Sequence, residues 1–100
     1  MKYFIRRDDI VRDLERAHSI AGANPNNVRT NDEIWNKVIK DFKKNETFLW
    51  DQKDLIMEYT QKQETENDED KKNTYEIIGK VIKNTTVFKP GYVPGWGYRN

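Results

Sequence analysis

The single histidine, His18, carries the side chain best suited to acid–base chemistry in this chain of 100 residues. A catalytic or metal-binding imidazole needs partner groups, and the nearest acid on the same helical face is Glu15. Ser19 is adjacent, but Ser-His-acid sites are assembled from distant segments. A single imidazole beside a stripe of apolar residues usually packs against neighbouring side chains and has no catalytic role. We therefore expect no catalytic role for His18 and no enzyme activity.

The acidic segment ETENDEDKK, residues 64–72, is the second candidate for chemistry. A calcium loop needs oxygen ligands at alternate positions, a glycine at the turn and a closing bidentate glutamate. Asp68 and Asp70 alternate, but no glycine follows them. The segment is therefore interpreted as a solvated loop or a frayed helix end, and we expect neither a metal site nor a cofactor.

Arginines gather near the amino terminus, with aspartates three and four residues from them. Asp9 and Arg12 are three residues apart, and Asp8 and Arg12 are four apart, which permits ion pairs along one helix. A phosphate-binding helix would leave its arginines without such partners. This pattern therefore predicts a solvated, mutually paired face.

Charge is distributed unevenly along the chain, although the formal net charge is only +1. Residues 1–44 carry a net charge of +3, residues 45–70 carry −7 and residues 71–100 carry +5. In the basic last third, cations alternate with aromatic residues, as in proteins that bind single-stranded nucleic acid. The candidate nucleic-acid contacts are Lys80, Lys83, Lys89 and Arg99. Nucleic-acid binding is the alternative function.

The last thirteen residues, FKPGYVPGWGYRN, have no helix or strand pattern. Two prolines favour extended backbone and three glycines permit sharp turns. Large aromatic rings that stay in water within so short a segment usually mark an interaction site. The candidate partner-binding residues are the anchors Phe88, Tyr92, Trp96 and Tyr98, with Pro90 and Pro94 holding the arm extended. The sequence leaves open whether this arm docks on its own body or on another subunit.

These features predict a non-enzymatic accessory or adaptor subunit that contacts other proteins of a larger assembly. A virion, a ribosome-like particle or a respiratory-type complex would each suit such a subunit. The chain has no cysteine, no apolar run long enough to span a bilayer and no signal-peptide core at its start. We therefore expect an intracellular protein, in the cytoplasm, an organelle interior or a virion, rather than a secreted one.

Apolar spacing predicts the elements that position these residues. Helices are expected over 9–21, from the Thr30–Glu33 capping box to about Lys44, over 48–63 after a cap at Thr47, and over 74–84. The fold class is mostly α: a small domain of three to four helices, residues 1–84 with an acidic loop at 64–72, followed by an extended arm over 85–100. The alternative is an α+β fold with a hairpin through 75–82 and 85–88.

The second and third helices are expected to pack against each other in antiparallel fashion, because the connection between them is short. Their shared core should consist of Trp35, Val38, Ile39, Phe42, Leu49 and Ile56.

Overall fold

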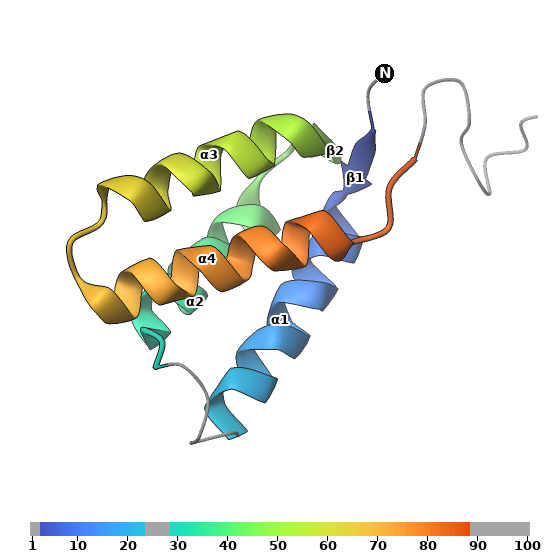
Figure 1. Cartoon of the computed structure of the whole chain (residues 1–100). Helices are drawn as coiled ribbons and strands as arrows, with labels where there is room; N and C mark the ends of the chain where they lie inside the picture. Colours follow the sequence, from blue (N-terminus) through green and yellow to red (C-terminus); the bar gives the residue numbers. More distant parts are fainter. Residues whose placement is uncertain (1–2, 24–28, 89–100) are drawn as a thin grey trace, which may run out of the picture.

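The computed structural model describes residues 3–23 and 29–88, and it confirms the mostly helical fold expected from the sequence (Figure 1). Within these residues the chain forms four helices and a small two-stranded sheet. The elements in order are β1 (Phe4–Arg6), α1 (Arg7–Ala23), α2 (Asp32–Lys44), β2 (Leu49–Asp51), α3 (Gln52–Thr65) and α4 (Glu69–Asn84).

Side-chain caps set the starts of three helices. The side-chain oxygen of Asn31 accepts a hydrogen bond from the backbone N–H of Ile34 at 3.0 Å, which opens α2 one residue after the expected cap at Thr30. Asp51 caps α3 by accepting from Lys53 N–H at 2.9 Å. Short polar side chains at this position satisfy amide groups that the helix leaves without a partner.

The fourth helix begins earlier than the sequence suggested. Asp68 accepts from Lys71 N–H at 3.0 Å, and α4 then runs from Glu69 to Asn84. The prediction of a loop over residues 64–72 is therefore wrong for 64–65, which end α3, and for 69–72, which begin α4. Glu69 and Asp70 in the first turn of α4 favour the positive end of the helix dipole. The alternative hairpin is wrong as well, since residues 75–82 are helical.

The start of the third expected helix is a strand instead. Leu49, Trp50 and Asp51 form β2, which pairs antiparallel with β1 in the register Phe4 to Asp51, Ile5 to Trp50 and Arg6 to Leu49. Neither strand was predicted from the sequence. Consequently α3 starts only at Gln52, and Leu49 lies 42% exposed rather than in the expected core.

Helices α3 and α4 run side by side, joined by a short connection, while α1 packs against α2 (Figure 1). The expected pairing of the second and third helices is therefore not the main contact of α3. Four of the six expected core residues are buried, whereas Ile56 is only half-buried. The buried apolar residues are Ile5, Ile10, Leu14, Ile34, Trp35, Val38, Ile39, Phe42, Leu55, Tyr59, Ile78 and Ile82.

Residues 85–88, which the sequence interpretation placed at the start of the arm, lie on this body. Thr85 is almost completely buried, and its hydroxyl donates to the carbonyl of Val81 at 2.8 Å. Val87 packs against the core, and Phe88 pairs with Phe4. Residues 89–100 lie outside the described residues. None of the helices in the described part has both the length and the apolar composition needed to cross a membrane.

Candidate protein-interaction site

The small sheet fixes the position of Phe88, the last residue that the structure describes. Phe4 and Phe88 each donate a backbone hydrogen bond to the other's carbonyl, both at 2.8 Å. On the opposite edge of β1, Arg7 N–H donates to Phe48 O and Gln52 N–H donates to Tyr3 O, also at 2.8 Å. Strand β1 therefore lies between β2 on one side and Phe88 on the other.

The two faces of this sheet differ in character. Ile5 is fully buried, and its partner Trp50 contacts Phe42 edge-on with ring centroids 4.9 Å apart. Because side chains alternate along a strand, Phe4, Arg6, Leu49 and Asp51 lie on the other face. This second face carries apolar groups beside charged ones.

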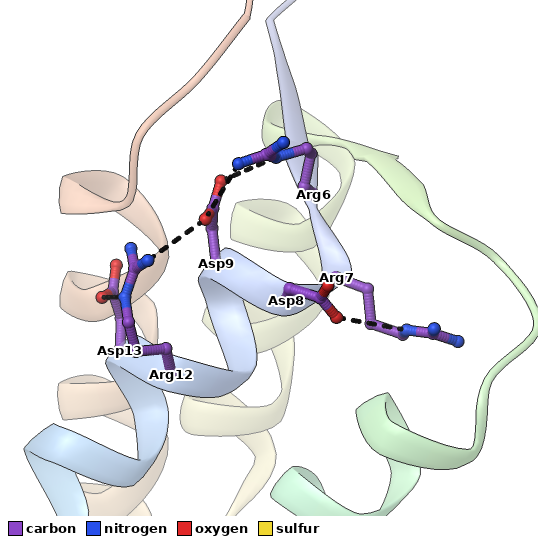
Figure 2. A network of polar contacts seen from close by, with 6 residues as sticks. All are labelled: Arg6, Arg7, Asp8, Asp9, Arg12 and Asp13. Carbon is purple, nitrogen blue, oxygen red and sulfur yellow. Dashed lines mark hydrogen bonds and ion pairs between the residues drawn. The ribbon is translucent and has the colours of Figure 1, made fainter. Parts of the chain in front are cut away.

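A network of ion pairs holds Arg6 in place (Figure 2). The nearly buried carboxylate of Asp9 contacts Arg6 Nε at 3.1 Å and Arg12 Nη1 at 3.4 Å. Arg12 Nε also contacts Asp13 at 3.3 Å. The expected pairing of Asp9 with Arg12 is thus confirmed. The guanidinium of Arg6 lies 5.1 Å from the ring centroid of Phe88. The network therefore also supports Phe88, which we call the root of the arm.

Phe48 and Leu49 form the apolar wall of a groove at one end of the sheet. Phe48 is 66% exposed, and the guanidinium of Arg7 lies over its ring at 4.5 Å. The groove has a volume of about 400 Å³, and its other lining residues are Arg6, Arg7 and Asp8. It therefore offers a partner an aromatic and an aliphatic surface with a cation next to them.

A larger groove lies at the other end of the sheet, where α3 begins. It has a volume of about 860 Å³. Its lining residues are Tyr3, Asp51, Gln52, Lys53, Asp54, Ile56 and Met57. Met57 is 60% exposed and Ile56 is half-buried, so apolar side chains line this groove together with the acidic Asp51 and Asp54. Strand β2 separates the two grooves, since Leu49 lines one and Asp51 lines the other.

The structure brings only part of the expected site residues into view. Phe88 bridges to β1, Lys80 lies 3.7 Å from Glu76 in an ion pair, and Lys83 is exposed in the last turn of α4. The remaining expected site residues lie outside the described residues. They are Lys89, Pro90, Tyr92, Pro94, Trp96, Tyr98 and Arg99.

His18 packs as the sequence suggested. Its ring stacks on Trp35 with centroids 5.3 Å apart, and its Nε2 lies 3.0 Å from Asp32 Oδ1. These contacts connect α1 to the start of α2. Within residues 3–23 and 29–88, no three histidine or acidic side chains are grouped in a way that could hold a metal ion.

A third hollow lies between α2, α3 and α4, beside Tyr59. Its volume of about 160 Å³ is small for an organic ligand. Burial raises the pKa of Tyr59 well above its usual value, and the nearby carboxylates of Glu58 and Asp41 raise it further. Burial likewise raises the pKa of Tyr75, whose ring lies 6.2 Å from that of Tyr59. Neutral phenols at this position suit a packed helix interface.

Comparison of the chain with protein-family models, with curated proteins and with solved structures finds no match.

The sequence interpretation missed the exposed residues beside β2. It placed Phe48 and Leu49 on the buried face of a helix, because their spacing from Leu55 and Ile56 fits helical periodicity. The sequence did carry one signal for the helix start, because Asp51 is a residue type that caps helices and α3 begins directly after it.

Proposed function

We propose that this chain is a non-enzymatic adaptor subunit of a larger assembly and that it binds other proteins through its C-terminal arm and the surface around β2. The observation that supports this proposal most is the position of its exposed apolar residues. Four large apolar side chains of the described part are strongly exposed, and three of them, Phe48, Leu49 and Met57, line the grooves beside β2. Exposed apolar surface gathered in this way is typical of docking sites.

The root of the arm supports the same interpretation. Phe88 joins the sheet whose other edge is β2, so the arm leaves the body close to these grooves. Aromatic residues beyond this point, such as Trp96 and Tyr98, offer large contact areas for few rotatable bonds. An anchored root beside an exposed apolar surface gives the partner one composite site.

Gradient sedimentation of an extract from the source tests the proposal. The chain should sediment with a larger particle, and Trp96→Ala with Tyr98→Ala, or Leu49→Ser alone, should release it to the top of the gradient. Ile20→Ser is the matched control, because Ile20 is exposed as well (56%, against 42% for Leu49) but lies on α1, away from β2. A wild-type chain that sediments alone would contradict the proposal. Binding to single-stranded nucleic acid that weakens steeply with salt would favour the alternative function instead.

A further inference from the structure

The groove at the start of α3 has the character of a surface that another segment covers. Met57 leaves most of its side chain in solvent, and Ile56 and Tyr3 continue the apolar floor. A methionine side chain adapts its shape and makes favourable sulfur contacts with aromatic rings. The groove therefore suits an aromatic side chain from an extended segment.

The last described residue, Phe88, lies beside the strand whose beginning reaches this groove. Phe88 pairs antiparallel with Phe4, and Tyr3, the residue before Phe4, lines the groove. Tyr3 accepts a hydrogen bond from Gln52 N–H at 2.8 Å, and both residues line the groove. Phe88, to which residues 89–100 are attached, is therefore close to one of the residues that line the groove.

Position along the chain favours one aromatic residue of the arm. Tyr92 is the first aromatic residue after Phe88, and a stretch of four extended residues spans about 13 Å. Pro90, between them, favours such an extended course. Trp96 and Tyr98 lie farther along the arm.

Charge supports the same placement. Residues 89–100 contain Lys89 and Arg99 and no acidic residue, whereas Asp51 and Asp54 stand at the rim of the groove with Lys53. Opposite charges of this kind attract the segment toward the rim. The short connection to Phe88 also keeps the arm at a high local concentration, on the order of millimolar.

We propose that the groove formed by Tyr3, Ile56 and Met57 holds the side chain of Tyr92 from the same chain. In this arrangement Tyr92 attaches the arm to the body, while Trp96 and Tyr98 stay available to contact the partner protein. This inference rests on the proposed function only in treating the arm as a docking element. Because the contact lies within one chain, the isolated protein tests it without any partner, so its failure is distinct from failure of the proposed function.

Disulfide trapping provides the test, since the natural sequence contains no cysteine. In the full chain, the pair Met57→Cys with Tyr92→Cys should form an intramolecular disulfide about tenfold faster than the control pair Ile20→Cys with Tyr92→Cys. Ile20 is exposed to a similar degree but lies outside the groove. Equal rates for the two pairs would overturn the proposal. Disulfide-linked dimers in place of monomers would overturn it too, because the groove would then hold the arm of a second copy.

Oxidation of Met57 by peroxide gives an independent measurement in the full chain. A methionine covered by an aromatic ring oxidises more slowly than an exposed one. Tyr92→Ala should therefore raise the rate of Met57 sulfoxide formation severalfold, while Tyr98→Ala should leave it unchanged. The same Met57 rate in the wild type and in both variants would contradict the proposed contact.

Discussion

Phe88 and Phe4 exchange two backbone hydrogen bonds of 2.8 Å, which join the end of the described chain to its first strand. Arg6 lies over the ring of Phe88, and Asp9 holds Arg6 through an ion pair at 3.1 Å. The root of the arm is thus connected to the first turn of α1 through side chains as well as backbone. Phe88 is consequently held in a fixed position on the body.

Two truncated chains should distinguish the contribution of Val87 and Phe88 to stability from that of residues 89–100. A chain that ends at Phe88 should keep nearly all of its helical circular dichroism, because every helix of the described part ends by Asn84. A chain that ends at Thr86 loses the bridge to Phe4 and the packing of Val87. It should be less stable than the first by about 1–3 kcal/mol. Urea unfolding of the two truncated chains measures the difference.

Two results of the truncation experiment would contradict this prediction. Equal stability of the two truncated chains would mean that the bridge between Phe4 and Phe88 contributes nothing in solution. Loss of the helical signal in the chain that ends at Phe88 would mean that residues 89–100 act as a strap required for folding, rather than as a docking element.

Asp9→Asn should destabilise the protein by about 1–3 kcal/mol, since hydrogen bonds to charged groups are worth more than neutral ones. The nearly buried carboxylate contacts both Arg6 and Arg12 (Figure 2), and an amide leaves these cations without their counter-charge. Asp8→Asn is the matched control, because the Asp8 side chain is 92% exposed and lies 3.9 Å from Arg7. Chemical unfolding at pH 7 should show little change for this control. A similar small change for Asp9→Asn would contradict a stabilising network.

Trp35→Ala should cost about 3–5 kcal/mol, because it removes a large, fully buried side chain that stacks on His18. Trp35→Phe should cost much less. It keeps an aromatic ring in the core and removes an indole N–H that has no hydrogen-bond partner among the described residues. Denaturant unfolding of both variants tests the pair. Equal losses for the two would indicate that the indole N–H contributes a hydrogen bond.

Local sequence pattern was sufficient for the helices but not for their exact starts. The spacing of Trp35, Val38 and Phe42 has the period of a helix, and that helix runs to Lys44 as predicted. The start of α4 was misjudged because the charge of residues 64–72 outweighed the capping signal of Asp68 and the acidic first turn that follows it. Capping groups determine where a helix begins, and apolar content only shows which face is buried.

The sheet could not be predicted from local pattern, because it depends on pairing between segments far apart in the chain. A strand as short as Phe4–Arg6 has too few residues to show a period, and its partner β2 fits helical spacing equally well. The grooves that form the candidate site depend on this pairing, since residues of β2 line both of them, Leu49 in one and Asp51 in the other. The composition of the arm is the basis for the docking role that we propose, whereas the exposed surface beside β2 could be found only from the three-dimensional arrangement.

The last prediction concerns the response of stability to alkaline pH. Burial raises the pKa of Tyr59 in the folded protein above its ordinary value of 10.0, and Glu58 adds to the effect. The unfolded chain therefore loses this phenolic proton first as pH rises, so the free energy of unfolding falls above pH 10 and is unaffected below it.

Tyr59→Phe removes the ionisable group and should reduce this loss of stability at alkaline pH. Urea unfolding of wild type and Tyr59→Phe at pH 7 and pH 10.8 measures it, with the pH 7 pair correcting for the missing hydroxyl. Parallel losses in the two proteins would show that Tyr59 ionises as easily in the folded state as in the unfolded one, and that the contact between α3 and α4 admits water.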